Sequence, residues 1–473
     1  MKLYNTLSRT KEELPPPDKQ KTISFYACGP TVYDETHIGH MRKYTMDDIL
    51  IRALEFEGYE VNHVMNITDV GHLTGDDDNG EDKLEKGAKK HGKTVSEVTG
   101  YYTDQFFMTM DALGVVRPDK VMKATEHIQK MIDLIKKLQD KGHVYETEQA
   151  VYFDVTTFPT YGQLSGQKLD EKKQAVRKDV YIDAEKKHPA DFALWFKRVG
   201  RFADHTMHWS SPWGEGFPGW HSECSAMSMA ALGETIDIHT GGIDHIPVHH
   251  ENEIAQSEAA TGKQFVKWWV HHAFLKVDDE KMSKSKGNFY SLKDIQKRNI
   301  DPLVLRYLFL QTHYRKELNF SWESIEAVQN ALKKLYDSAM VFEKNEQYNY
   351  RTATEPSSEV LTLLQQFKEA IADDLNTSKA LGILHQMLEK ATNDTDTVYI
   401  LAIADEVFGL QLKEKGITHP KHIIPHEIKQ LAQQRLEAKQ QKDFERSDAL
   451  RKQIEKKGYE IEDLRTGYNI RKK

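Results

Sequence analysis

The hydrophobic pattern near the amino terminus predicts a strand, a turn and a helix. An apolar run from Ile23 to Ala27 ends at a Cys-Gly-Pro turn. Apolar residues then recur at helical spacing over positions 46–54, and Gly58 closes the segment. This order of elements is the first unit of a nucleotide-binding α/β domain, whose ligand lies at the carboxyl end of the strand.

Later patterns extend this unit along the chain. We expect further strands at 61–67, 235–239 and 268–271, and a helix from Pro247 to Gly262. Between the two halves, a helix, short strand-like runs at 144–155 and a Lys-rich linker at 168–188 indicate an insertion. Beyond about residue 300 the pattern is helical throughout. An acidic run at 75–82 lacks the full spacing of a calcium loop, so we expect a solvated loop there.

Composition narrows the class of protein. The chain has 473 residues, of which 39% are hydrophobic and 29% charged, as in an ordinary soluble globular protein. Its net charge of −8 argues against indiscriminate nucleic-acid binding. Residues 427–473 nevertheless hold 13 Lys and Arg against 9 Asp and Glu, which leaves room for a local RNA contact. We find no signal peptide and no membrane-spanning run, and we expect a cytoplasmic protein.

Two groups of residues are suited to binding a nucleoside triphosphate. His37 and His40 begin the first predicted helix, and the amino end of a helix favours phosphate. Lys281 and Lys284 flank a polar loop after a strand, where ammonium groups can neutralise charge on a leaving pyrophosphate. Each pattern alone is also typical of a surface turn. Their occurrence in one chain favours a nucleotide site.

A third group suits a metal ion. His249 and Glu253 are four positions apart, hence on one face of the helix that begins at Pro247. Two cysteines are too few for a disulfide framework, but Cys28 and Cys224 lie on elements that an α/β topology brings to one sheet edge. Thiolates, an imidazole and a carboxylate together suit Zn²⁺. Spacing alone leaves four neighbouring histidines as rival ligands: His221, His239, His245 and His250.

Two motifs carry a family resemblance. His37-Ile38-Gly39-His40 and Lys281-Met282-Ser283-Lys284-Ser285 resemble the two signatures of class I aminoacyl-tRNA synthetases. Several further segments, including those around both cysteines, resemble the cysteinyl-tRNA synthetase family: 28–34, 66–69, 160–165, 219–227, 249–256, 313–315 and 373–377. The resemblance covers essentially the whole chain.

The resemblance implies an α/β fold. We expect a Rossmann-like class I synthetase catalytic domain with an inserted connective domain, followed by an all-α helical bundle and a small C-terminal anticodon-binding domain. The implied boundaries are a catalytic domain at 1–117 and 216–290, a connective insertion at 118–215, a stem-contact segment at 291–330, a helical bundle at 331–412 and an anticodon-binding domain at 426–473.

The resemblance also assigns roles to residues. One Zn²⁺ per chain is expected on Cys28, Cys224, His249 and Glu253. The pocket for the amino acid is expected at Thr68, Trp220 and Asp244, with Asp244 placed for the substrate ammonium group. ATP, bound with Mg²⁺, is expected to meet Thr31, His37, Gly39, His40 and Lys284. The catalytic residues are then His37, His40, Lys281 and Lys284.

The implied function is zinc-dependent ligation of cysteine to tRNA(Cys). ATP would convert cysteine to cysteinyl-adenylate and pyrophosphate, and the cysteinyl group would pass to the 3′ end of the tRNA. The resemblance implies a monomer that does not contact membranes. Two alternatives stay open: a ligase that passes cysteine to an amino sugar, as in mycothiol synthesis, and a non-catalytic tRNA-binding paralogue.

Overall fold

A computed structural model describes most of the chain. The described residues are 1–71, 73–75, 79–168, 183–282, 287–345, 349–351, 356–418, 426–441, 443–464 and 467–472. They form two compact units, Met1–Ile417 and Thr418–Lys473, and each unit is treated by itself. Ser283 and Lys284 of the predicted lysine loop lie outside the described residues.

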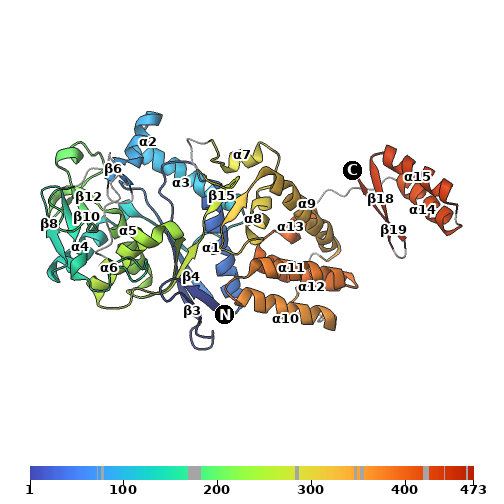
Figure 1. Cartoon of the computed structure of the whole chain (residues 1–473), viewed down its shortest axis with the longest axis horizontal. Helices are drawn as coiled ribbons and strands as arrows, with labels where there is room; N and C mark the ends of the chain where they lie inside the picture. Colours follow the sequence, from blue (N-terminus) through green and yellow to red (C-terminus); the bar gives the residue numbers. More distant parts are fainter. Residues whose placement is uncertain are drawn as a thin grey trace. The chain divides into compact units, whose positions relative to one another are not determined.

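A parallel sheet of five strands lies at the centre of the larger unit (Figure 1). Its order is β14 (Val266–His272), β13 (Ile236–Gly242), β3 (Thr22–Ala27), β4 (Glu60–Ile67) and β7 (Lys120–Lys123). From β3 the chain moves outward to β4 and β7, and it later returns on the other side to form β13 and β14. The strand order therefore reverses between β3 and β13, where open α/β sheets bind their ligands.

Helices pack around this sheet. The helices of this part are α1 (Ile38–Phe56), α2 (Lys83–His91), α3 (Val95–Ala112), α5 (Trp220–Leu232) and α6 (Glu251–Thr261). Helix α1 is buried on most of its surface because it contacts both the sheet and the helices that follow residue 300. It ends where predicted, since Gly58 follows it with a positive φ of 97°.

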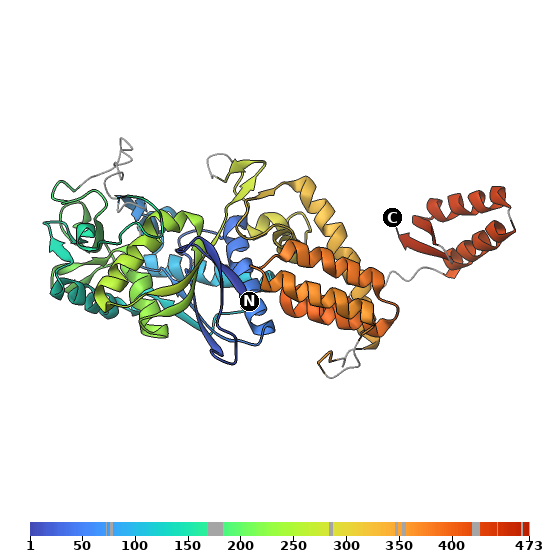
Figure 2. The same cartoon turned by 60° about the horizontal axis from the view of Figure 1, so that its bottom comes forward.

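The predicted insertion forms a second sheet at one side of the larger unit (Figure 2). Helix α4 (Ile128–Asp140) precedes an antiparallel sheet of order β11 (Trp209–Ser211), β12 (Gly214–Pro218), β10 (Phe192–Lys197), β9 (Ala150–Phe153) and β8 (Val144–Glu146). Short strands were expected at 144–155, and two of these strands lie there. Most of the Lys-rich linker lies outside the described residues.

Two hairpins and a small sheet complete the strands of this unit. They are the pair β1 (Lys2–Asn5) and β2 (Thr10–Glu13), the pair β5 (Leu73–Gly75) and β6 (Asn79–Asp82), and a sheet of β16 (Glu280–Lys281), β15 (Leu275–Val277) and β17 (Leu318–Phe320). The acidic run at 75–82 was expected to be a solvated loop. That expectation is wrong for Asp82, which is buried and caps α2 through hydrogen bonds to two backbone amides.

Helices dominate the remainder of the larger unit. They are α7 (Leu292–Gln296), α8 (Pro302–Leu310), α9 (Trp322–Ala339), α10 (Ser358–Ala372), α11 (Thr377–Lys390), α12 (Asp394–Phe408) and α13 (Leu412–Thr418). Figure 1 shows that α9 to α13 gather on one side of α1, opposite the insertion. Asn376 caps α11, since its side chain accepts a hydrogen bond from the amide of Lys379 at 3.2 Å.

The expectation that the chain is helical throughout beyond residue 300 is wrong in two places: β17 is a strand of the larger unit, and the smaller unit contains a hairpin. Helices α14 (His426–Gln440) and α15 (Phe444–Lys456) are followed by an antiparallel hairpin of β18 (Tyr459–Leu464) and β19 (Gly467–Lys472). Its first strand alternates apolar and charged residues, which is the pattern of a half-buried strand. Ile461 of β18 packs in a small core with residues of both helices.

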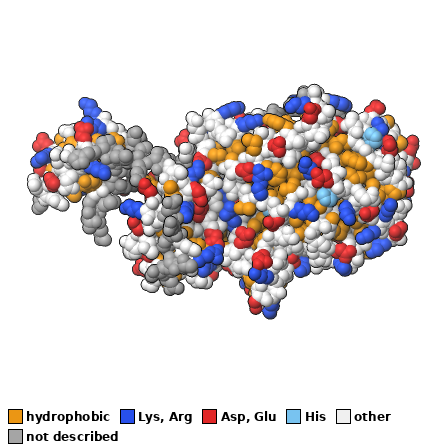
Figure 3. Space-filling model, turned by 180° about the vertical axis from the view of Figure 1, so that it is seen from behind, with side chains coloured by type: hydrophobic (Ala, Val, Ile, Leu, Met, Phe, Trp, Pro, Cys, Tyr) orange, Lys and Arg blue, Asp and Glu red, His pale blue; other side chains and the backbone are white. Residues whose placement is uncertain are grey.

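The mixed surface charge and the polarity of the helices agree with the composition of the chain. On the face of the larger unit in Figure 3, Lys and Arg side chains are interspersed with Asp and Glu side chains. Among the described residues, the helices are all too short or too polar to cross a membrane. The α/β fold class is confirmed, while the individual domain boundaries stay predictions.

Candidate metal centre and amino-acid pocket

The two cysteines of the chain meet in the interior. Cys28 follows β3 directly, Cys224 lies in the second turn of α5, and both side chains are buried. Their Sγ atoms are 4.0 Å apart, and both thiols are free. Two thiolates bound tetrahedrally to one Zn²⁺ at about 2.3 Å would have sulfurs about 3.8 Å apart, so this pair fits a shared ion.

His249 and Glu253 face the same cluster. Asp244 lies in the 3₁₀ turn Ile243–His245 that follows β13, and a π-helical turn, Ile246–His250, leads from there into α6. Such π turns occur frequently at functional sites. Nε2 of His249 lies 2.9 Å from Oε1 of Glu253, yet neither atom makes a hydrogen bond of good geometry within the described residues. Buried nitrogen and oxygen atoms without a good hydrogen bond need another partner, and a shared metal ion would supply one to both.

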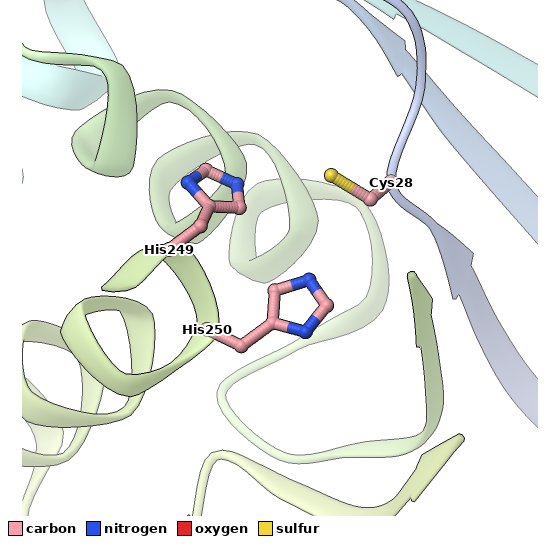
Figure 4. Close-up of side chains that lie close together, drawn as sticks. All are labelled: Cys28, His249 and His250. Carbon is pink, nitrogen blue, oxygen red and sulfur yellow. The ribbon is translucent and has the colours of Figure 1, made fainter. Parts of the chain in front are cut away.

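Two of the rival histidines also reach the cluster. Figure 4 shows the Cys28 sulfur and the rings of His249 and His250 directed toward one space. Three overlapping groups place potential ligand atoms within 4.8 Å of one another: Cys28 with His249 and His250, Cys224 with His249 and Glu253, and His239 with His250 and Glu253. The structure thus brings the four predicted ligands together but adds His239 and His250. The choice of ligands among them stays a prediction.

Outer contacts orient these side chains. Nε2 of His239 lies 2.9 Å from Oε2 of Glu253, and Nδ1 of His249 lies 3.0 Å from Nδ1 of His221. Nδ1 of His250 lies 2.8 Å from Nε2 of His271. Metal-binding side chains are commonly held by such second contacts.

Protonation within the cluster is strongly perturbed. A hydrogen bond from the Cys224 thiol lowers the pKa of Cys28 well below its usual range, although burial acts against this. The same hydrogen bond, together with burial, raises the pKa of Cys224. Burial disfavours the charged form of His249, but the Glu253 carboxylate raises its pKa to about 10. A metal ion that binds here therefore displaces protons from Cys224 and His249.

The residues predicted to line an amino-acid pocket lie beside this cluster. The indole of Trp220 stacks on the ring of His249, with centroids 4.0 Å apart. Thr68 follows β4, is buried, and donates a hydrogen bond from Oγ1 to Oε2 of Glu223 at 2.8 Å. Asp244 is exposed. The carboxyl edge of the sheet thus carries metal donors, an aromatic face and an exposed carboxylate.

The predicted ATP signature lies at the start of α1. His37 caps this helix, and its Nδ1 accepts hydrogen bonds from the amides of Gly39 and His40 at 3.1 and 3.3 Å. Because these two amides are engaged, the imidazole rings are the groups left to face a phosphate. Thr31 pairs with Thr68 in an isolated parallel bridge, so the predicted ATP and amino-acid sites adjoin.

The lysine segment adjoins this signature. A Cβ placed on Gly39 would lie 2.6 Å from Cε of Met282, so the two signature motifs come together at Gly39. The Lys281 ammonium group lies 5.5 Å from the ring centroid of Phe274. Lys284 lies outside the described residues.

Comparison with known proteins agrees with this geometry. Residues 15–330 match the family model described as the class I (C) tRNA synthetase catalytic domain. A protein called cysteine–tRNA ligase from Treponema denticola is 43% identical, over 98% of each chain. The chain belongs to this synthetase family. Proteins of the same name from Borreliella burgdorferi and Chlorobaculum tepidum are 39% and 40% identical, and each comparison covers 100% of this chain and 99% of the relative.

A solved structure supports the fold assignment. A methionyl-tRNA synthetase from Mycobacterium tuberculosis, in complex with methionyl-adenylate, has a TM-score of 0.56 at 15% identity. The match covers 85% of this chain and 92% of that one. The prediction of a class I synthetase, and with it of an aminoacyl-tRNA ligase, is confirmed. The roles of individual residues stay predictions.

Family membership leaves some close contacts of this synthetase unexplained. Glu251 is buried, and its carboxylate accepts hydrogen bonds from the backbone amides of Gly162, Leu164 and Ser165 at 2.8 to 3.1 Å. The insertion is thereby attached to α6, between the His249 and Glu253 positions. Both segments were recognised as family motifs, but their pairing was not predictable because it joins positions far apart in sequence.

Proposed function

We propose that this chain is a zinc-dependent cysteine–tRNA ligase. The observation that carries the proposal is the convergence of Cys28, Cys224, His249 and Glu253 in one buried cluster beside the predicted amino-acid pocket. The names of relatives that match 98–100% of the chain support the same substrate. The reaction uses ATP with Mg²⁺ and has cysteine and tRNA(Cys) as its other substrates.

The donor set accounts for selectivity. Cysteine and serine differ by one atom, and shape alone discriminates such mimics by only about 1–3 kcal/mol. When bound by these four residues, Zn²⁺ would take the sulfur of cysteine as a thiolate, which the far less acidic hydroxyl of serine cannot match. Asp244 would hold the ammonium group, and Trp220 would cover the side chain.

The first chemical step needs positioning and charge neutralisation. The carboxylate oxygen of cysteine attacks the α-phosphorus of ATP, a new P–O bond forms, and the bond to the β-phosphate oxygen breaks with release of pyrophosphate. His37, His40, Lys281, Lys284 and Mg²⁺ would neutralise the developing charge. In the second step, the 3′-terminal ribose hydroxyl of tRNA takes the cysteinyl group and AMP leaves.

The molecule that accepts the cysteinyl group distinguishes a tRNA ligase from an amino-sugar ligase. An amino-sugar ligase would share the adenylate step, and a non-catalytic paralogue would lack it. The excess of Lys and Arg over residues 427–473 favours tRNA as the acceptor. We further propose a monomer that acts in the cytoplasm.

The decisive experiment is ATP–pyrophosphate exchange with the purified full-length chain. Exchange should depend on cysteine, should fail with serine, and should coincide with zinc bound to the chain. A second arm tests transfer of labelled cysteine to a tRNA(Cys) transcript and to glucosaminyl-inositol. Removing zinc with a chelator should collapse the preference for cysteine over serine. Absence of cysteine-dependent exchange in the zinc-loaded protein would contradict the proposal.

A further inference from the structure

A chain of hydrogen bonds runs through the interior between the two cysteine positions. The amide of Gly29 donates to Oδ1 of Asn66 at 2.7 Å, and Nδ2 of Asn66 donates to Oγ1 of Thr68 at 3.2 Å. Oγ1 of Thr68 in turn donates to Oε2 of Glu223 at 2.8 Å. The chain of bonds begins one residue after Cys28 and ends one residue before Cys224.

The members of this chain cannot move freely. Asn66, Thr68 and Glu223 are each exposed by at most 1%. A Cβ on Gly29 would lie 1.7 Å from the backbone oxygen of Asn66, which keeps the two segments in close approach. The hydrogen bonds of Thr68 are therefore held by rigid neighbours on both sides.

These contacts determine which further hydrogen bonds the Thr68 hydroxyl can make. A hydroxyl has one hydrogen to donate and two lone pairs to accept with. Burial raises the pKa of Glu223, and its Oε2 accepts the hydrogen of Thr68 both in the ionised form and in the neutral form that carries the proton on Oε1. One lone pair of the hydroxyl takes the side-chain amide of Asn66. One lone pair remains. Thr68 can therefore accept a further hydrogen bond, but it has none left to donate.

We propose that Glu223 is a positioning residue that fixes the Thr68 hydroxyl as a hydrogen-bond acceptor for the ammonium group of the substrate amino acid. This inference rests on the proposed function, because it takes Thr68 as part of the cysteine pocket. An ammonium group only donates and a carboxylate only accepts. A hydroxyl held in this state attracts the ammonium end of cysteine and disfavours its carboxylate.

The placement of Glu223 supports this role. Glu223 lies three positions after Trp220 on α5, so both side chains project from the same face of the helix. Trp220 stacks on His249, which places that face beside the metal cluster. Oε1 of Glu223 is buried and makes no hydrogen bond within the described residues. The carboxyl group therefore reaches the pocket region with Thr68 as its described partner.

Binding of two small thiols to zinc-loaded, full-length protein tests the proposal. Cysteamine keeps the thiol and ammonium groups of cysteine but lacks the carboxylate, whereas 3-mercaptopropionate keeps the thiol and carboxylate but lacks the ammonium. Calorimetric titration of Glu223→Ala should show cysteamine binding weakened by roughly tenfold, because the Thr68 hydroxyl is no longer held with its free lone pair toward the ammonium group and its hydrogen bond to that charged group weakens. Binding of 3-mercaptopropionate should stay within about twofold. Glu223→Gln should retain cysteamine binding, because its amide oxygen can still accept from Thr68.

Other outcomes would overturn the inference. Equal weakening of both thiols, or loss of zinc in Glu223→Ala, would assign Glu223 a structural role at the metal. Equal losses of cysteamine binding in the Ala and Gln variants would show that Glu223 acts through its charge. Unchanged cysteamine binding would show that Glu223 does not position Thr68 for the ammonium group. Should Glu223→Ala fail to fold, Thr68→Val removes the acceptor with little change of shape and must show the same selective loss. Failure of the proposed function is distinguishable, since it appears as absent cysteine-dependent exchange in the unmodified protein.

Discussion

The imidazole rings of His37 and His40 stack at the start of α1, with their centroids 3.6 Å and their planes 25° apart. Gly39 lies between them in sequence. A Cβ at Gly39 would lie 2.9 Å from Cε1 of His37, in addition to its clash with Met282. The position of the His37 ring, on which His40 stacks, thus depends on the absence of a side chain at Gly39.

We expect Gly39→Ala to lower cysteine-dependent ATP–pyrophosphate exchange on the order of 10²-fold, because catalytic groups displaced by about 1 Å have this effect. Unfolding by urea should change little, since alanine is a better helix former than glycine. Gly100→Ala in α3 is a matched control, because nothing lies within 4 Å of its added carbon. Similar exchange rates for the two variants would contradict the role assigned to Gly39.

The metal ligands can be separated from their rivals by substitution. His249 and His250 are adjacent and both buried, but only His249 belongs to the predicted set of four ligands. We expect His249→Ala to lose its zinc during dialysis against a chelator. His250→Ala should retain zinc, with an affinity lowered by no more than about 10–100-fold, as for residues that support a ligand. Zinc content is measured by mass spectrometry. The reverse result would transfer the ligand role to His250.

Local pattern was sufficient to predict much of the fold. The period of apolar residues located β3, α1 and β4, and the i,i+4 spacing paired His249 with Glu253 before their distance was known. The hairpin formed by β18 and β19 was missed, although the alternation at 459–464 was present, because it follows a long run of helices. Whether a segment is a helix or a strand can therefore be predicted where the spacing of its apolar residues stays regular over the whole element.

Contacts between distant segments were not predictable from pattern. The approach of Cys28 to Cys224 was expected only from topology, and the i,i+4 spacing that favours His249 as the partner of Glu253 does not exclude His239 or His250 as ligands. The bond from Thr68 to Glu223 spans 155 positions. A side chain's partners across the fold depend on how whole elements pack, which a single sequence does not display.

Acid should destabilise the larger unit through His63. This β4 residue is buried, and Nε2 makes no hydrogen bond within the described residues. Burial lowers the pKa of His63 from 6.5 to about 4. Because the unfolded chain takes up the proton first, the stability present above pH 6.5 is lost as the pH falls toward 4. The loss amounts to about 3 kcal/mol at most, from 1.36 kcal/mol per pKa unit.

The pH dependence of urea unfolding checks this prediction. His63→Phe cannot be protonated and keeps a ring against Phe25, which packs edge-on to His63 with centroids 5.4 Å apart. Between pH 6.5 and 4, the free energy of unfolding should therefore fall less steeply for this variant than for the unmodified protein. Parallel curves over that interval would show that His63 is not protonated on unfolding.

A buried ion pair joins α1 to α8, one of the helices that follow residue 300. Arg306 of α8 and Asp48 of α1 are in contact, and both are at most 2% exposed. Arg306 also donates from Nε to the backbone oxygen of Phe408 at 2.6 Å and from Nη1 to that of Leu113 at 3.1 Å. One guanidinium group thus connects four segments of the chain.

We expect Arg306→Leu to lower the free energy of unfolding by about 3 kcal/mol, because the substitution leaves two buried carbonyl groups without this donor and removes one of two arginines from the buried carboxylate of Asp48, which keeps its bond from Arg52. Arg117→Leu is the matched control. Its partner Asp111 lies 2.6 Å away, and both side chains are 50% exposed, so its loss should cost no more than about 1 kcal/mol. Urea unfolding of the two variants provides the comparison. Equal shifts would show that the burial of Arg306 and its two bonds to backbone carbonyls add nothing to its contribution.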